Sequence, residues 1–162
     1  MPLTHTVILA RAQSSADIAV ARELFLEYAA GLGFPLDYQN FDEELASLPG
    51  NYATPGGMLL LARVDDKPAG CGAFRQLEPA ICEMKRLYVR PEFRRLGLGR
   101  RLANQLFAEA RTIGYHAMRL DTVAEKMGEA VSLYKSLGFR EIPAYYLKAR
   151  AGTLFFELRL DR

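Results

Sequence analysis

The chain of 162 residues has few of the side chains that form disulfides or metal sites, and it has little net charge. Its two cysteines, Cys71 and Cys82, each lie in an apolar, strand-like run where free thiols are usually buried, so reduced thiols are expected rather than a disulfide. His5 and His116 form no metal-ligand spacing with the cysteines or carboxylates, so no metal is expected. With 21 basic and 19 acidic residues, no overall charge draws the chain to nucleic acid.

Long apolar runs, repeats and low-complexity stretches are also absent. No segment approaches the roughly 18 apolar residues that a membrane-spanning helix needs, and the N-terminal residues lack the pattern of a signal peptide. We therefore expect a cytoplasmic protein with no membrane partner. The length fits a single domain over residues 1–162, since domains cluster at roughly 100 to 150 residues, and 50% of the residues are hydrophobic, which is enough for a core.

Hydrophobic periodicity and turn signals predict alternating strands and helices. Strands are expected at residues 6–12, 58–64, 69–76, 81–89, 117–122 and 153–160, with a further one beginning at Phe139. Helices are expected from Ser14 or Ser15 to Gly31 or Gly33, from Asn40 to Leu48, from Leu98 to Ile113, and from Met127 to Leu137. This order predicts an α/β fold with a mixed sheet, antiparallel first and then with one parallel strand-helix-strand step.

Three local patterns add detail. Asn40 and Glu43 have the spacing of a capping arrangement at the start of the second helix. In the third helix an apolar stripe is expected, closed by a C-terminal cap at Gly114, and it comprises Leu98, Leu102, Leu106, Ala110 and Ile113. Alternation along the strand at 81–89 places Glu83, Lys85, Leu87 and Val89 on one face, and Cys82, Met84, Arg86 and Tyr88 on the other.

The segment that follows this strand is a candidate anion site. Gly97 and Gly99 stand directly ahead of a predicted helix, where unpaired backbone N–H groups and the positive end of the helix dipole attract anions. Glycine also lets an anion come close to the backbone. The surrounding arginines suit the oxygens of a pyrophosphate or phosphomonoester, and they are Arg94, Arg95, Arg100 and Arg101.

Three known phosphate-binding loops can be compared with this segment. A Walker loop ends in Gly-Lys-Ser/Thr, whereas Gly99 is followed by two arginines. A dinucleotide fingerprint needs a third glycine where Leu102 stands, although Asp121 fits the position of its ribose-binding acid. The third loop, Arg/Gln-x-x-Gly-x-Gly/Ala, agrees with Arg94-Arg-Leu-Gly97-Leu-Gly99 at every fixed position. In this loop the sequence resembles the GNAT superfamily of N-acetyltransferases.

The resemblance extends from about residue 58 to residue 142. It includes the stretch Glu83-Met-Lys-Arg-Leu-Tyr-Val89 before the loop and Leu133-Tyr-Lys-Ser-Leu-Gly-Phe139 after the next strand and helix. It implies the family's fold, a mostly antiparallel central sheet flanked by helices, in which the parallel fourth and fifth strands splay apart. The pantetheine of acetyl-CoA, the co-substrate, would lie in that gap.

The resemblance also assigns residues to acetyl-CoA. Backbone groups at the end of the strand and amides of the glycine loop would hold it, together with side chains of the following strand and helix. The cofactor-binding set is Leu87, Tyr88, Val89, Arg94, Arg95, Leu96, Gly97, Leu98, Gly99, Arg100, Thr122, Ala130, Leu133 and Tyr134. Many members of the superfamily have an asparagine after the fifth strand, whereas Asp121 and Thr122 stand here, which leaves that contact open.

Two residues are candidates for the chemistry of acyl transfer. Glu83 occupies a position where several family members carry a general base, and a carboxylate in a largely apolar strand should have a raised pKa. Its alternative role is as an ion-pair partner of Lys85, Arg86 or Arg119. Tyr134 matches the tyrosine that protonates the leaving thiolate, and its phenol has a pKa above that of a thiol. Its alternative role is as a core aromatic.

The acceptor side is the least specified part of the site. In the family fold the first two helices and the loop between the last two strands wall it, which brings together Tyr28, Phe34, Phe41, Tyr145 and Tyr146. We expect Tyr28, Phe34 and Tyr145 to bind the acceptor, and the rings to favour a small amine with an apolar body. The alternative is that the rings only pack the helices onto the sheet. A polyamine would need an acidic rim, which Asp37, Asp42, Glu43 and Glu44 could supply.

The leading functional hypothesis is an enzyme that transfers the acetyl group of acetyl-CoA directly to a primary amine of a small molecule or peptide. The first alternative is a non-catalytic acyl-CoA-binding module that keeps the loop without turnover. The presence of Glu83 and Tyr134 favours the enzyme. A nucleic-acid-binding domain is disfavoured because no aromatic residues are interleaved with the arginines of the loop. The sequence leaves the acceptor and the oligomeric state open, a homodimer included.

Overall fold

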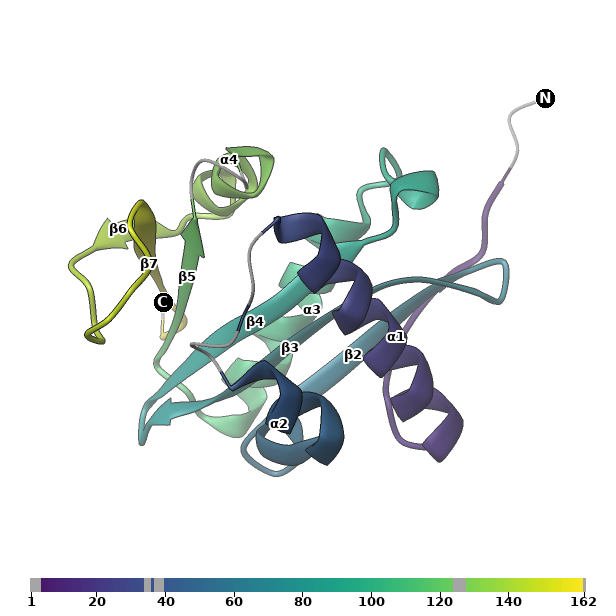
Figure 1. Cartoon of the computed structure of the whole chain (residues 1–162), viewed down its shortest axis with the longest axis horizontal. Coiled ribbons are helices and arrows are strands. Elements are labelled where there is room, and N and C mark those ends of the chain that lie inside the picture. Colours follow the sequence, from purple (N-terminus) through teal and green to yellow (C-terminus); the bar gives the residue numbers. More distant parts are fainter. Residues whose placement is uncertain (1–3, 34–35, 37–39, 124–127, 162) are drawn as a thin grey trace.

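The computed structural model describes residues 4–33, 36, 40–123 and 128–161 (Figure 1). The strands are β1 (Val7–Arg11), β2 (Met58–Val64), β3 (Lys67–Glu78), β4 (Ile81–Val89), β5 (Ala117–Val123), β6 (Arg140–Ile142) and β7 (Thr153–Arg159). The helices are α1 (Ser15–Leu32), α2 (Phe41–Ser47), α3 (Leu98–Ile113) and α4 (Gly128–Ser136), with short 3-10 turns η2 (Gly50–Tyr52) and η3 (Pro91–Phe93). This is the predicted order of elements. Met127, placed by prediction in the last helix, lies outside the described residues.

The strands of the described chain form one sheet in the order β1-β2-β3-β4-β5-β7-β6, and every neighbouring pair is antiparallel except β4 with β5. The parallel pairing is short, because it joins residues 81–83 to residues 117–119 and its last pair is Glu83 with Arg119. Both strands continue well beyond that pair, β4 to Val89 and β5 to Val123, and Figure 1 shows them diverging. The mixed sheet and the splay of its parallel strands are confirmed.

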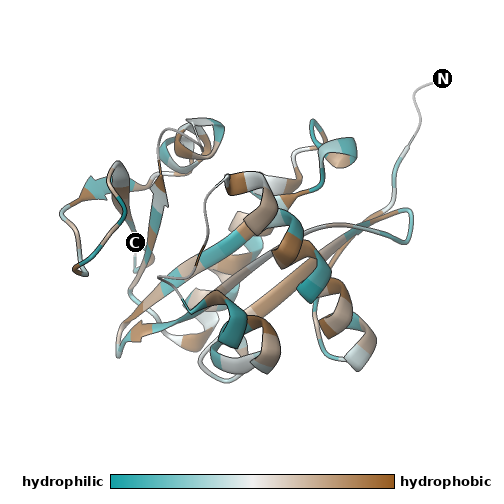
Figure 2. Ribbon diagram, in the orientation of Figure 1, coloured by the Kyte–Doolittle hydropathy of each residue, from teal (hydrophilic) through white to brown (hydrophobic). Residues whose placement is uncertain are grey.

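Helices cover both faces of the sheet (Figure 1). On one face, Phe25 of α1 and Phe41 of α2 share a buried cluster with Leu59 of β2. On the other face, Leu106 of α3 packs with Phe74 of β3. In Figure 2 the strands at the centre of the sheet are mainly apolar, whereas α1 and α2 show both colours. Strands covered on both faces are expected to have such nearly continuous apolar sequences.

The N-terminal cap of α1 agrees with the sequence, and that of α2 does not. The hydroxyl of Ser14 accepts a hydrogen bond from the N–H of Asp17 at 3.0 Å, and the carboxylate of Asp17 accepts one from the N–H of Ser14, which completes a capping box. At α2, Asn40 has a left-handed backbone with φ of 55°, and its side chain makes no capping hydrogen bond. The predicted cap with Glu43 is wrong, because a capping side chain reaches the helix from an extended backbone.

The apolar stripe of α3 is confirmed except at its end. Leu98, Leu102, Leu106 and Ala110 are all buried, whereas Ile113 is 40% exposed. Residues 111–114 are all exposed, so Ile113 lies on the part of the helix that extends into solvent. Gly114 ends the helix in the left-handed conformation that was predicted, and its N–H donates to the carbonyls of Ala110 and Arg111.

A β-bulge in β4 overturns the predicted faces of that strand. Cys71 pairs with Tyr88 and Ala73 pairs with Lys85, so Gly72 alone lies opposite two residues, Arg86 and Leu87. The backbone of Arg86 takes up the extra residue with a φ of 61°. A one-residue shift exchanges the faces, because side chains alternate along a strand. Leu87 and Val89 therefore join Cys82 and Met84 on the α3 side, while Arg86 and Tyr88 join Glu83 and Lys85 on the side of α1 and α2.

The cysteines are free and buried, as expected from their apolar surroundings. Burial raises the pKa of the Cys82 thiol to about 12, so it stays protonated at neutral pH. Within the described ranges, the structure has no helix of the length and apolar character required to cross a membrane.

Candidate active site

A groove lies between the end of β4 and α4, with α1 and the start of α3 contributing to its walls. Eight of its lining residues belong to the set that the resemblance assigns to acetyl-CoA, and they are Leu87, Tyr88, Val89, Arg94, Gly99, Ala130, Leu133 and Tyr134. Thr122 is buried in the adjoining cavity between β4 and β5. Residues that are far apart in the sequence therefore lie together at this groove in the folded chain.

The loop before α3 presents its backbone toward open space. Arg95 and Gly97 have left-handed φ values of 75° and 72°, and a Cβ atom at Gly97 would meet no atom within 4 Å. The N–H of Arg101 donates to the carbonyl of Gly97 at 3.1 Å. The N–H groups of residues 98–100 precede this first helical hydrogen bond, and such groups can bind an anion. Leu98 is 2% exposed and packs into the core, so its side chain is not available to a ligand.

Two arginines assigned to the cofactor are anchored beside this loop. Arg94 lines the groove and donates from Nε to the carbonyl of Val89 at 3.1 Å. Arg100 donates from Nη2 to the hydroxyl of Ser136 at 2.7 Å and so connects α3 with α4. Arg95 and Leu96 are exposed on the loop.

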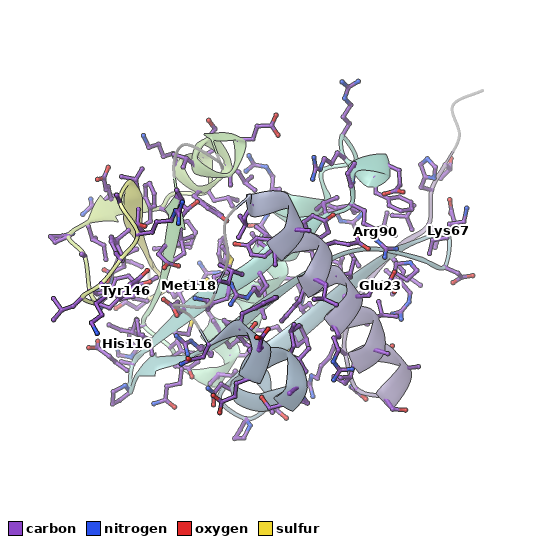
Figure 3. The ribbon with its side chains drawn as sticks, in the orientation of Figure 1. Glu23, Lys67, Arg90, His116, Met118 and Tyr146 are labelled. Carbon is purple, nitrogen blue, oxygen red and sulfur yellow. The ribbon has the colours of Figure 1, made fainter. Side chains whose placement is uncertain are left out.

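Arg90, the residue after β4, is bound to the acidic side of α1. Its Nη2 lies 2.8 Å from Glu23 and 2.7 Å from Glu27, and Figure 3 shows Arg90 turned toward Glu23. Tyr88 also donates from its hydroxyl to Glu27, at 3.2 Å. The hydrogen bonds from Arg90 are the main reason that the pKa of Glu27 lies below its usual range. Arg90 is thereby paired within the fold, which weakens the case for a nucleic-acid-binding patch.

Tyr134 lies where the groove meets the cavity between the splayed strands, since it lines both. It is 5% exposed, and its ring packs against that of Phe139 with centroids 5.8 Å apart. Burial raises the pKa of its phenol, and the nearby Tyr28 and Asp121 add to the rise. The phenol therefore keeps its proton at neutral pH and can donate a hydrogen bond into the cavity.

Lys85 and Asp121 form the border between two cavities. One is the cavity between β4 and β5 that Tyr134 lines. The other also contains Glu83 and lies toward Tyr145 and Tyr146. A ligand that passed from one cavity to the other would therefore contact these two side chains.

Glu83 is 2% exposed and surrounded by donors, which contradicts the expectation of an apolar setting. Arg75 donates to its Oε1 from Nε at 3.1 Å and from Nη2 at 3.0 Å. Tyr145 donates to Oε2 at 2.6 Å, and the Nζ of Lys85 lies 3.8 Å from Oε1. The ion-pair role weighed for Glu83 is thus present, with Arg75 as its closest cation.

Lys85 carries a buried ammonium group between two carboxylates. Its Nζ lies 3.8 Å from Glu83 and 3.9 Å from Asp121, and its side chain is 7% exposed. Burial lowers the pKa of Lys85, and the two carboxylates partly oppose this effect. Asp121 in turn accepts a hydrogen bond from the hydroxyl of Tyr146.

The aromatic residues expected on the acceptor side occupy different places. Tyr145 and Tyr146 line the cavity with Glu83, whereas Tyr28 lines the groove and the cavity between the strands. Phe41 is buried, and the guanidinium of Arg86 lies 5.2 Å from its ring centroid. Phe34, and Asp37 of the expected acidic rim, lie outside the described residues. The cavity beside Glu83 is lined mainly by charged and hydroxyl groups rather than by apolar rings.

Two side chains of this cavity, Arg75 and Lys85, were not assigned to the site from the sequence, whereas Tyr146 was expected on the acceptor side. Arg75 pairs with Glu83 across the β3–β4 hairpin, and the turn between those strands fixes this register. Lys85 stands two residues after Glu83, on the same face of β4. Both signals are present in the sequence, but they depend on the exact hairpin register.

The profile of the acetyltransferase (GNAT) family matches residues 20–139. An uncharacterized N-acetyltransferase of Schizosaccharomyces pombe is 38% identical over 148 residues, which cover 90% of each chain. The chain belongs to the GNAT family of acetyltransferases.

Solved structures with the GNAT fold superimpose on nearly the whole chain. A GNAT-family acetyltransferase of Staphylococcus aureus has a TM-score of 0.80 at 20% identity, covering 96% of this chain and 99% of the other. The Salmonella typhimurium protein yncA, whose structure contains its cofactor acetyl-CoA, has a TM-score of 0.68 at 22% identity and covers 96% and 94%. At these identities the likeness shows the fold. Within the described part of the GNAT chain, no group of three or more His, Cys, Asp or Glu side chains is placed to hold a metal ion.

Proposed function

We propose that this GNAT protein is an enzyme that transfers the acetyl group of acetyl-CoA directly to a primary amine. The observation that carries the proposal is the continuity of the site. The groove with the glycine loop, the cavity between the splayed strands and the cavity with Glu83 share lining residues, Tyr134 for the first two and Lys85 for the last two. A donor held in the groove and an amine from the far side can therefore meet between β4 and β5.

The chain's residues fit the donor. The open backbone at Gly97 and the N–H groups at the start of α3 suit the phosphates of acetyl-CoA. Leu87, Ala130 and Leu133 provide an apolar lining for the remainder. An amine as acceptor is the family's reaction, and the acceptor cavity supplies buried charged groups to orient it.

The reaction forms a bond between the amine nitrogen and the acetyl carbon and breaks the bond between that carbon and the sulfur of CoA. The nitrogen gives up one proton, and the departing sulfur accepts one. Glu83 is proposed as the base, acting directly or through water, because its carboxylate lies in the acceptor cavity. Tyr134 is proposed as the donor to the sulfur. Burial keeps its hydroxyl protonated, so it can donate a hydrogen bond that strengthens as negative charge develops on the sulfur, then pass its proton to the sulfur and regain one from solvent.

Release of free CoA thiol from acetyl-CoA with a panel of primary amines tests the proposal. We expect turnover with at least one amine, and Tyr134→Phe should lower kcat by about 10- to 1000-fold while acetyl-CoA still stabilises the fold. Tyr115→Phe is the matched control, because that buried hydroxyl donates at 2.6 Å to Gly56, which contributes to none of the three cavities. Binding of acetyl-CoA without release of thiol for any amine would instead support a non-catalytic acyl-CoA-binding module.

A further inference from the structure

The cavity beside Glu83 has a balance of charge that bears on the acceptor. Two cations and three carboxylates line it, and they are Arg75, Lys85, Glu44, Glu83 and Asp121. Glu44 is already neutralised, because Arg86 donates to both of its oxygens at 2.9 Å. Two carboxylates and two cations remain, so the cavity is itself zwitterionic.

Donors within the protein already occupy the carboxylates. Glu83 accepts two hydrogen bonds from Arg75 at one oxygen and one from Tyr145 at the other. Asp121 accepts from Tyr146. Glu83 therefore has little acceptor capacity left for a ligand that offers only N–H groups, whereas the Oδ1 of Asp121 has, among the described residues, only the longer contact with Lys85 at 3.9 Å.

The cations, in contrast, keep unused donors. Lys85 lies 3.8 Å and 3.9 Å from its two carboxylates, beyond hydrogen-bond distance, and no acceptor in the described chain is bonded to its Nζ. Arg75 uses Nε and Nη2, and its Nη1 has no hydrogen-bond partner among the described residues. The side chain of Arg75 is 37% exposed, and no buried side-chain nitrogen or oxygen among the described residues lacks a partner, so these donors are open to solvent and available to a ligand. The cavity therefore favours a ligand that brings negatively charged oxygens.

We propose that the acceptor is a free amino acid, whose carboxylate binds to Arg75 and Lys85 and whose amino group is thereby held beside Glu83. This inference rests on the proposed acetyl transfer and names its acceptor. Both cations lie within 4 Å of one atom, the Oε1 of Glu83, so one carboxylate can reach both. A zwitterionic ligand also matches a cavity with two charges of each sign.

Other acceptors fit this cavity less well. A polyamine brings only cationic donors and no acceptor for Arg75 and Lys85, and Glu83 is already engaged by Arg75 and Tyr145. A hydrophobic monoamine offers no acceptor to the donors of Arg75 and Lys85. A peptide N-terminus lacks the carboxylate on the carbon that bears the amine. These three classes are the alternatives that an experiment must separate.

The test compares acceptors that share one skeleton. Leucine, leucinamide and 3-methylbutylamine form one series, and phenylalanine, phenylalaninamide and phenethylamine form another, with spermidine alongside. The measurement is kcat/KM for release of CoA thiol. It is made at several pH values, because acceptors whose amines differ in basicity would otherwise differ in rate even without selective binding. We expect kcat/KM for the amino acid to exceed that for its amide and for its decarboxylated amine by about 10- to 100-fold. This is the size of effect that losing a charged hydrogen bond produces. Equal or better rates with the amides, the amines or spermidine would overturn the inference while leaving acetyl transfer intact.

A variant tests the assignment of Lys85. Lys85→Met should remove most of the preference for the acid over the amide, mainly by raising KM for the acid, while stabilisation by acetyl-CoA persists. Lys67→Met is the control, because Lys67 is exposed and lies at the opposite end of the molecule from Tyr146 in Figure 3. An unchanged preference in Lys85→Met would refute the role of Lys85. If Lys85→Met does not fold, the wild-type series decides alone.

A second readout does not depend on turnover. In the presence of CoA, amino acids should raise the melting temperature more than their amides do. If no amine releases CoA thiol, the proposed function fails, and this binding comparison then decides the inference separately: equal shifts for acid and amide would reject it.

Discussion

Arg86 and Glu44 connect the bulge of β4 to helix α2 through two hydrogen bonds of 2.9 Å. The side chain of Arg86 is 2% exposed and that of Glu44 is 16% exposed. The guanidinium also lies over the rings of Tyr28 and Phe41, at 5.7 Å and 5.2 Å from their centroids. A strained backbone position in the strand is thereby held by contacts with both helices of the acceptor side.

Glu44→Ala should destabilise the protein by about 2 kcal/mol, because it removes two charged hydrogen bonds from the buried guanidinium of Arg86. Urea unfolding at neutral pH measures the loss. Glu43→Ala is the matched control on the same helix, since Glu43 is exposed and should change stability by less than about 0.5 kcal/mol. Similar values for the two variants would contradict the importance given to this ion pair.

The fold was predictable from the sequence because its signals are local. Apolar strands, glycine caps such as Gly114 and the capping box at Ser14 each act within a few residues. The bulge at Arg86 was not predictable in this way, because it depends on how β4 pairs with β3. It changed the face of every residue after it, including Leu87 and Val89.

The candidate site likewise has one part that local sequence signals indicate and one part that depends on how the strands pair. The loop from Arg94 to Gly99 could be proposed from the sequence because its chemistry is contained in one short segment. The charged cavity could not, because Arg75, Lys85 and Asp121 come from three strands and meet only in the folded sheet. The apolar acceptor pocket stays a prediction, because Phe34 lies outside the described residues, but Phe41 is buried against Arg86 rather than open to a cavity, a contact that depends on the bulge.

Acetyl-CoA should raise the stability of the wild-type protein, and Gly97→Glu should abolish that effect. A ligand at a hundredfold excess over its Kd adds about 2.7 kcal/mol, and Gly97→Glu would place a carboxylate in the open space at the loop. A thermal shift assay with acetyl-CoA gives the measurement. Gly97→Asn is the control, because asparagine tolerates the left-handed φ of 72° without adding charge. Equal shifts for wild type and Gly97→Glu would contradict the assignment of the loop.

Glu27→Gln should reveal a contribution to stability that depends on pH. The pKa of Glu27 is lowered in the folded state below its ordinary value of 4.5, so its contribution is full above that value and disappears as the pH falls through the folded pKa. Since the side chain is 34% exposed, solvent screening limits the effect to about 0.5–1 kcal/mol at pH 7.

Urea unfolding of wild type and Glu27→Gln at pH 7 and near pH 3 measures this difference, which should shrink at the lower pH. Glu23→Gln is the control, because Glu23 pairs with the same arginine but is 63% exposed and should have a smaller effect. A difference of the same size at both pH values would rule out the linkage.

Glu83→Gln should lower kcat/KM mainly near neutral pH, because the amide cannot accept the proton of the acceptor amine. Activity should recover in part at high pH, where more of the amine is unprotonated. Glutamine retains the size of the side chain and one carbonyl acceptor for Arg75, so stabilisation by acetyl-CoA should be unchanged. Glu78→Gln is the control on the neighbouring strand, since Glu78 is 57% exposed and pairs with Arg119 at 3.8 Å outside the cavity. If Glu83→Gln lowered kcat/KM by the same factor at every pH, Glu83 would act by holding Arg75 and Tyr145 in place rather than as the base.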